Sequence, residues 1–198
     1  MTEMTAIKDI AEIRTGYTFR RGEPRDGHYE LLGLHISDIR HSRVIDHEVL
    51  KPVLWEAKGL PPVLEPGEVV LAAKGNYNPA ALYEGPQYKV VPSSQFLILT
   101  VKTRARERLS PAYLCWVLNY ASTQRRMADT QTGTNIPSVS KRALADIEMP
   151  VPSLAQQEKI LQLQAIGDAQ REAMKALLTN NENMLNGMFQ QLINGVTQ

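Results

Sequence analysis

The stretch GTNIPSVSKRALADIEMPVPSLAQQEKI, residues 133–160, holds the boundary between two kinds of structure. It begins as a polar loop, continues as a short apolar run interrupted by Pro150 and Pro152, and ends in a helix start. Ser153 and Gln156 have the spacing of a capping box, in which a serine and a glutamine three residues later satisfy backbone groups of the first turn. The stretch therefore predicts a domain over residues 1–152 and a helical segment over residues 153–198.

Beyond this boundary the sequence predicts one long helix. No proline occurs from Leu154 to Gln198, and the composition shifts to Ala, Leu, Met, Gln, Asn and Glu. A helix of about 40 residues is on the order of 60 Å long, which exceeds the diameter of a small domain, so its apolar stripe needs a partner. The apolar positions that recur near the helical period are Leu163, Ile166, Ala173, Leu177, Met184, Met188 and Leu192.

Residues 1–152 have the pattern of an α+β domain built on a mixed sheet. Short β-prone runs separated by Gly, Pro and Asn predict strands within residues 29–36, 68–74, 81–83, 88–91 and 95–102, and DIEMPVP predicts a last strand. Isoleucines three apart predict a short helix over residues 5–13. Ser110 and Pro111 predict the start of a helix that runs to about Asp129.

Composition bounds the class of protein. Of the 198 residues 43% are hydrophobic and 22% are charged, as in a soluble globular protein, and the single cysteine suits the reducing cytoplasm. No apolar run is long enough for a membrane span, and no signal peptide is recognisable. The net charge of +1 does not decide for or against nucleic acid. Basic residues cluster, however, at Arg20–Arg21, Arg104–Arg108, Arg125–Arg126 and Lys141–Arg142, where they would be either solvated surface charges or phosphate contacts.

Catalytic motifs are weak. No glycine-rich phosphate loop is present, so we expect no nucleotide cofactor. Asp46 with Glu56 and Lys58 has the outline of a metal-dependent nuclease, and Asn78-Pro-Ala-Ala81 has part of an amino-methyltransferase motif, but each pattern is degenerate. The four histidines (His28, His35, His41 and His47) have no metal-ligand spacing. We therefore predict no catalytic residues, no metal and no cofactor.

Two polar loops have the chemistry of DNA recognition. Lys74, Gly75, Asn76, Tyr77 and Asn78 follow a predicted strand; Lys and Asn side chains can read guanine and adenine edges, although a simple β-turn has the same residues. The second loop, residues 130–142, is polar and then basic, which matches base contacts followed by phosphate contacts. The further DNA-binding residues predicted are Arg20, Arg21, Arg125, Arg126, Thr134, Asn135, Ser138, Ser140, Lys141 and Arg142.

The order of these features resembles one half of the specificity (S) subunit of Type I restriction–modification systems. The similar segments are IRTGYT (13–18), LLGLHISDI (31–39), LEPGEVVL (64–71), PAYL (111–114) and GTNIPSVS (133–140). DIEMPVPSLAQQEKI (146–160) is the most specific, because it resembles the family's boundary between a target recognition domain and a spacer helix. The resemblance spans nearly the whole chain.

This resemblance implies a function and a set of partners. The domain would read one half of a DNA target, and the helix would pair antiparallel, as a coiled coil, with that of a second copy, giving a homodimer and a bipartite palindromic site. Adenine methylation and ATP-dependent restriction would belong to partner subunits, so this cytoplasmic chain would itself be non-catalytic. A full S subunit has two such domains and two helices, so the chain is either a short natural form or part of a longer one. A protein–protein adaptor and a small nuclease or methyltransferase are the alternatives.

Overall fold

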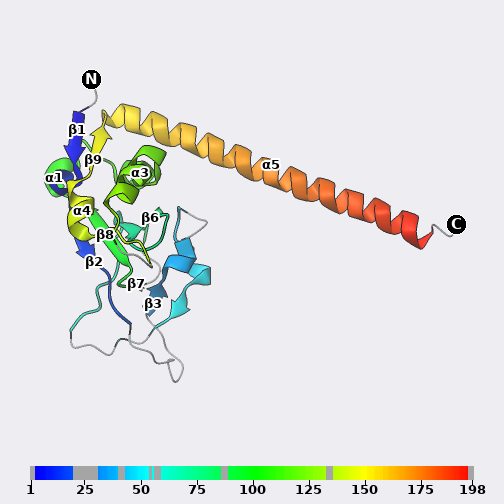
Figure 1. Cartoon of the computed structure of the whole chain (residues 1–198), viewed down its shortest axis with the longest axis horizontal. Helices are drawn as coiled ribbons and strands as arrows, with labels where there is room; N and C mark the ends of the chain where they lie inside the picture. Colours follow the sequence, from blue (N-terminus) through cyan, green and yellow to red (C-terminus); the bar gives the residue numbers. More distant parts are fainter. Residues whose placement is uncertain are drawn as a thin grey trace. The chain divides into compact units, whose positions relative to one another are not determined.

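The computed structural model describes residues 3–19, 31–39, 43–53, 55, 59–85, 89–132 and 136–195. The chain divides into two compact units, Met1–Gln157 and Glu158–Gln198, which we call the head and the helical unit. The described strands and helices α1 to α4 belong to the head, and the helical unit consists of α5 beyond its first turn (Figure 1).

The secondary structure runs as follows. The strands are β1 (Glu3–Ala6), β2 (Ala11–Thr15), β3 (Leu31–Leu34), β4 (Lys51–Pro52), β5 (Val69–Ala72), β6 (Ala80–Leu82), β7 (Lys89–Pro92), β8 (Phe96–Val101) and β9 (Glu148–Val151). The α-helices are α1 (Ile7–Ile10), α2 (Pro111–Asn119), α3 (Ala121–Thr130), α4 (Lys141–Asp146) and α5 (Leu154–Asn194). Short 3₁₀ turns are η1 (Ile36–Ile39), η2 (His47–Val49) and η3 (Thr103–Ala105).

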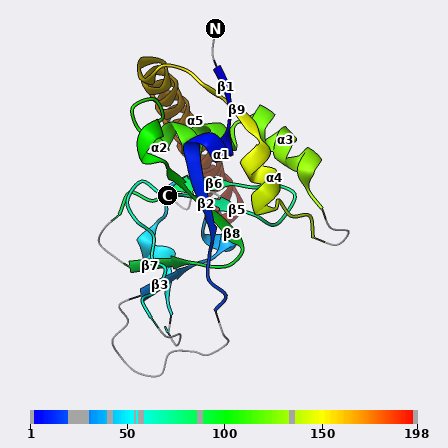
Figure 2. The same ribbon diagram turned by 90° about the vertical axis from the view of Figure 1, so that its left-hand side faces the viewer.

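The described strands of the head form three small sheets. The largest is antiparallel in the order β2-β8-β5-β6, and its central strands are almost entirely buried, which explains their unbroken apolar sequence. The second has the order β4-β3-β7 and is mixed, because β3 pairs parallel with β7 and antiparallel with β4. Figure 2 shows the strands of the largest sheet at the centre of the head, with β3 and β7 below them. The predicted α+β class, with a mixed sheet and a long C-terminal helix, is confirmed.

The third sheet joins the two ends of the head. β1 pairs antiparallel with β9, and Met4 lies opposite Pro150. Among the described residues this sheet consists of two strands, so a proline in β9 interrupts no central ladder. The Tyr113 hydroxyl donates a hydrogen bond of 3.0 Å to the Pro150 carbonyl and ties β9 to α2. The strand predicted from DIEMPVP is confirmed.

Two predictions about helices need correction. Residues 5–13 do not form one helix: α1 is a single turn between β1 and β2, because residues from Ala11 onward pair with β8 instead of continuing the turn. The helix predicted from Pro111 to Asp129 is two helices. Tyr120 between them has extended backbone (φ −71°, ψ 140°), and the Gln124 side chain donates to the freed Leu118 carbonyl at 2.7 Å.

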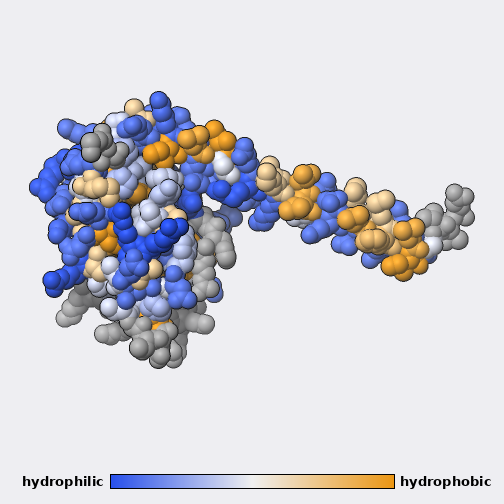
Figure 3. Space-filling model, turned by 45° about the horizontal axis from the view of Figure 1, so that its top comes forward, coloured by the Kyte–Doolittle hydropathy of each residue, from blue (hydrophilic) through white to orange (hydrophobic). Residues whose placement is uncertain are grey.

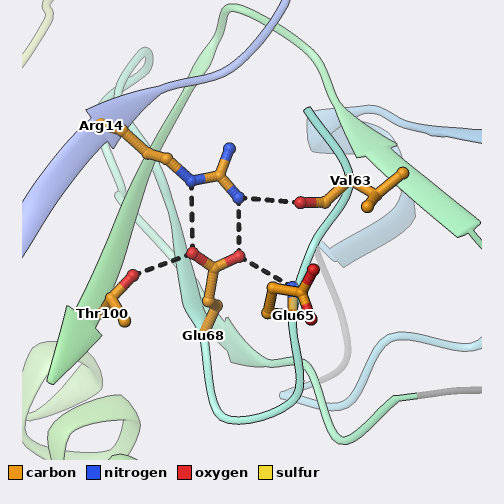
Figure 4. Close-up of polar contacts among 5 residues, drawn as sticks. All are labelled: Arg14, Val63, Glu65, Glu68 and Thr100. Carbon is orange, nitrogen blue, oxygen red and sulfur yellow. Dashed lines mark hydrogen bonds and ion pairs between the residues drawn. The ribbon is translucent and has the colours of Figure 1, made fainter. Parts of the chain in front are cut away.

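An ion pair between the buried Glu68 and the partly exposed Arg14 links the strands of the largest sheet. Pro66 and Gly67 form a turn in which Gly67 has φ +87°. This turn places Glu68 directly before the first residue of β5. The Glu68 carboxylate accepts two hydrogen bonds from Arg14 of β2, at 2.6 and 3.2 Å (Figure 4). It also accepts from the Thr100 hydroxyl of β8 at 2.8 Å and from the Glu65 backbone N–H at 2.9 Å. Glu68 is therefore buried with its charge fully partnered.

Gly16, the glycine of IRTGYT, lies where the backbone of another segment leaves no room for a side chain. A Cβ on this residue would lie 2.0 Å from the Ser93 carbonyl oxygen and 2.5 Å from that of Pro92. Tyr17 fixes this approach, since its N–H donates to Pro92 at 2.8 Å and its carbonyl accepts from the Ser94 N–H at 2.7 Å. The segment after β2 thus crosses the end of β7 at a distance that only glycine permits.

We expect Gly16→Ala to lower the free energy of unfolding of the head by about 3 kcal/mol, because backbone atoms have to move to admit the methyl group. Urea denaturation followed by tryptophan fluorescence measures the change. Gly187→Ala is the matched control, since nothing lies within 4 Å of a Cβ there. Equal unfolding midpoints for Gly16→Ala and the wild type would show that the close approach is not rigid.

Helix α5 begins where the capping-box spacing predicts, and the glutamine half of the box is formed. The Gln156 side-chain oxygen accepts hydrogen bonds from the Ser153 N–H at 3.2 Å and from the Ser153 hydroxyl at 3.1 Å, and the helix continues for 41 residues. It ends at Asn194, before Gly195 with φ +65°. Within the described residues, no helix combines the length and the apolar character that a membrane span requires.

Candidate nucleic-acid interface

The two loops predicted to read DNA lie side by side. Lys74 and Ser138 form an antiparallel bridge, and the Gly75 N–H donates to the Pro137 carbonyl at 2.9 Å. One residue further on, the Val139 N–H donates to the Ala73 carbonyl at 2.9 Å. We call residues 73–78 and 136–140 the loop pair. Segments about 60 residues apart in the sequence thus form one surface.

Glutamines of α3 and its end hold the first loop in place. Gln131 donates from its amide to the Gly75 carbonyl and to the Asn78 side-chain oxygen, both at 2.9 Å. Gln124 donates to the Asn78 carbonyl at 2.7 Å and accepts from the Asn78 N–H at 3.2 Å. Gly75 has φ +109°, a conformation that favours glycine. These bonds fix the backbone from which the exposed side chains of the loop project.

Asn78 needs a correction, because it was predicted to contact DNA. Its side chain is 1% exposed, donates to the Ala72 carbonyl at 2.8 Å and accepts from Gln131. Both ends of the amide are thus used inside the head, and Asn78 shapes the loop instead of reading bases. Because it is buried and fully bonded, Asn78 is also not placed to contact a substrate base, as the asparagine of a methyltransferase motif would be.

We expect Asn78→Ala to destabilise the head by about 2 kcal/mol, because the Ala72 carbonyl and the Gln131 amide lose buried partners. Chemical denaturation measures the loss. The neighbouring exposed variant Asn76→Ala serves as the control and should unfold at the wild-type midpoint. Equal midpoints for both variants would contradict a structural role for Asn78.

The other predicted residues of the loop pair differ in exposure. Lys74, Asn76 and Tyr77 are exposed, and Gly75 is half-buried beneath them. Ser138 is half-buried, with its hydroxyl 3.4 Å from the Thr132 carbonyl. Ser140 is exposed but caps α4, its hydroxyl accepting from the Ala143 N–H at 3.1 Å. Thr134 and Asn135 lie outside the described residues.

Cations lie on the helices next to the loop pair. Lys141 and Arg142 form the exposed first turn of α4, directly after Ser140, and Arg125 is exposed on α3. Helices α3 and α4 pack against each other, and Figure 2 shows them side by side. Arg126 is also exposed, but its guanidinium donates to the Glu148 carbonyl and so ties α3 to β9. Arg20 and Arg21 lie outside the described residues.

Two arginines of the basic cluster, Arg104 and Arg108, and the preceding Lys102 make contacts within the head. The Lys102 ammonium donates to the Lys8 carbonyl, and Arg104 donates to the Asp9 carbonyl at 3.3 Å, so both cations satisfy acceptors of the single-turn helix α1. Arg108 lies 3.4 Å from the Glu3 carboxylate. These contacts stabilise the β1–α1 segment.

The residues considered for catalysis do not form a site in the described part of the chain. Asp46 caps η2 by accepting from the Glu48 N–H at 2.9 Å, and Glu56 and Lys58 lie outside the described residues. Burial raises the pKa of the Cys115 thiol to about 12, so it is not the thiolate that nucleophilic catalysis needs. His28 and His41 also lie outside this part, within which no three His, Cys, Asp or Glu residues gather as metal ligands.

Sequence reasoning missed Gln157, the only buried residue of α5. Its amide donates to the Arg108 carbonyl at 2.6 Å and to the Pro152 carbonyl at 2.8 Å, and accepts from the Ser110 N–H at 3.0 Å. It therefore joins the first turn of α5 to the start of α2. The second glutamine of SLAQQEKI was the available signal, since only the first is needed by the capping box.

The apolar stripe of α5 is wider than predicted. All seven predicted residues are exposed, from Met188 at 54% to Leu192 at 80% among the large ones. Five more exposed apolar side chains extend the stripe, and Figure 3 shows such side chains gathered along the helix. These are Met174, Leu178, Leu185, Phe189 and Ile193. The signal was the repeated adjacent pairs, such as Leu177–Leu178 and Met188–Phe189.

Comparison with known proteins defines the fold. No protein-family model matches the sequence, and no curated protein matches it either. Solved structures do. The HsdS subunit from Thermoanaerobacter tengcongensis aligns with a TM-score of 0.65 at 15% identity, and the alignment covers 97% of this chain and 44% of that one. A structure described as the basis of complex assembly and conformational transition of the type I R-M system aligns with a TM-score of 0.69 at 14% identity, with the same coverage.

A third structure agrees with these two. The S subunit of the Type I restriction–modification system from M. genitalium aligns with a TM-score of 0.56 at 14% identity, over 97% of this chain and 46% of that one. The chain therefore has the fold of one half of a Type I specificity subunit. It spans less than half the length of the structures it matches.

Proposed function

We propose that this chain is a DNA-recognition subunit, or part of one, in a Type I restriction–modification system. The observation that carries the proposal is the loop pair, which presents Lys74 and Asn76 on a backbone fixed by buried hydrogen bonds. These side chains are suited to guanine and adenine edges, and the nearby cations Arg125, Lys141 and Arg142 are suited to phosphates. The likeness of the fold to specificity subunits supports the same function.

The proposed action needs partners. We propose that adenine methylation and ATP-dependent cleavage belong to modification and restriction subunits, and that this chain is non-catalytic and directs them to a sequence. Because such a system acts on double-stranded DNA within the cell, we place the chain in the cytoplasm. Asp46 and Asn78, which were considered for catalysis, have structural roles, which is consistent with this division of work.

We further propose that two copies assemble through α5. The exposed apolar stripe runs from Leu163 to Ile193. A helix with so much apolar surface is stable when another element covers that surface. An antiparallel pairing with a second copy would cover it and would place two heads in inverted orientation, so that the target would be a bipartite palindrome. The helix length would set the spacing between the half-sites.

We expect Asn76→Ala to relax the preference at one base pair, because the loss of a bidentate contact costs about 1–3 kcal/mol of discrimination. Lys141→Ala and Arg142→Ala should instead weaken binding to all sequences about equally and reduce its salt dependence. Fluorescence anisotropy on matched and mutated duplexes separates the two effects. Arg106→Ala, an exposed cation outside the loop pair, is the control.

If Asn76→Ala and Lys74→Ala both keep the sequence preference of the wild type, residues outside the loop pair read the bases. A head that binds no DNA, but binds a protein partner at any salt concentration, would favour the adaptor alternative instead.

A further inference from the structure

The loop pair exposes two large apolar side chains that base reading by polar groups does not use. In the described part of the head only five such side chains are more than half exposed: Val44, Val49, Leu60, Tyr77 and Ile136. Two of these five, Tyr77 at 53% and Ile136 at 63%, lie on the loop pair. Single exposed apolar residues are ordinary, but two on one short, otherwise polar surface indicate a partner with an apolar group.

Ile136 lies next to the junction that joins the two segments of the loop pair. Lys74 bridges Ser138, and the Gly75 N–H donates to the Pro137 carbonyl, so Asn76 and Ile136 are the residues that follow this junction on the two segments. The backbone on both sides is held by hydrogen bonds, to Gln131 on one side and to Thr132 on the other. An amide suited to adenine and a branched apolar side chain are thus presented together.

The surroundings decide which kind of partner fits. Lys74, Lys141 and Arg142 make the neighbourhood cationic, which favours a polyanion over an apolar protein surface. The apolar group that a duplex presents on a base edge is the 5-methyl of thymine, in the major groove. In an A·T pair this methyl lies on the same groove edge as the adenine N6 and N7 that an asparagine reads.

We propose that Ile136 packs against the 5-methyl group of a thymine in the A·T pair that Asn76 reads. This inference rests on the proposed DNA-recognition function and assigns part of its specificity. The pair of side chains distinguishes A·T from its reverse, because both the amide contacts and the methyl contact change position when the pair is inverted.

Replacing thymidine with deoxyuridine tests the contact, because it removes only the methyl group. Duplexes recovered by the 198-residue chain from a randomised pool are resynthesised with one thymidine replaced at a time. We expect one replacement per half-site to weaken wild-type binding about fourfold, the effect of one buried methyl-sized group. Ile136→Ala should bind the thymidine duplex more weakly and lose its sensitivity to that replacement. Leu60→Ala, equally apolar and 93% exposed outside the loop pair, should behave like the wild type.

Each result has a separate meaning. Specific binding with no sensitive thymidine, or full sensitivity retained in Ile136→Ala, overturns this inference and leaves the proposed function standing. If the sensitivity to the replacement is lost in Tyr77→Ala but kept in Ile136→Ala, Tyr77 makes the methyl contact and the assignment to Ile136 is wrong. If no sequence is recovered from the pool, the proposed function fails and the inference fails with it. Circular dichroism confirms that each variant is folded.

Discussion

Replacing Glu68 with alanine should lower the free energy of unfolding of the head by about 3 kcal/mol, the low end of the range for breaking a buried ion pair. The substitution removes four hydrogen bonds at once and leaves Arg14 facing the space of the missing carboxylate (Figure 4). The Arg14 side chain is 35% exposed and can recover part of its hydration, which is why the low end applies. Urea denaturation measures the difference.

Two further variants separate charge from geometry. Glu68→Gln keeps the shape but not the charge, so it should lose less than Glu68→Ala while remaining below the wild type. Asp146→Ala is the surface control, because Asp146 and its partner Lys8 are both 56% exposed and such pairs contribute little. A loss in Glu68→Ala no larger than in Asp146→Ala would show that Glu68 does not hold the sheet together.

Replacing Leu177 or Met184 with glutamate should turn a dimer of this chain into a monomer at micromolar concentration. Burial of one such side chain contributes about 2 kcal/mol, and two-fold symmetry counts each substitution twice. The dissociation constant should therefore rise on the order of a thousandfold, before the cost of burying a charge is added. Sedimentation velocity gives the oligomeric state directly.

The opposite side of α5 provides the control. Asn183 lies away from the apolar stripe at 3.6 residues per turn, so Asn183→Glu should leave assembly unchanged. If the wild type and Leu177→Glu sediment identically, both alone and with a modification subunit, α5 does not serve as the assembly helix.

Local features could be predicted from the sequence because their causes are local. The cap at Ser153, the proline-interrupted strand β9 and the apolar strands β5 and β8 follow from residues within a few positions of each other. The prediction of one helix over residues 5–13 was wrong, because the isoleucine spacing fits one buried turn as well as a longer helix. Pairing of the following residues with β8, almost 90 residues away, decided between them.

The candidate site shows the same limit. Both loops were recognisable by composition, but their pairing through Lys74 and Ser138 depends on the tertiary fold. Asn78 is the same residue type as Asn76, two positions before it, and the two differ in burial, which the sequence does not show. Gln157 was not predicted, because its bond to the start of α2 joins residues almost 50 positions apart in the sequence.

Selection of bound DNA from a pool of randomised duplexes, by the 198-residue chain alone and with a Type I modification subunit, tests the proposed function most directly. We predict an enriched motif made of two inverted copies of one half-site with a constant gap between them. We also predict that Asn76→Ala relaxes one position in each copy. Recovery of no enriched motif in either condition would contradict the proposal that this chain reads DNA sequence.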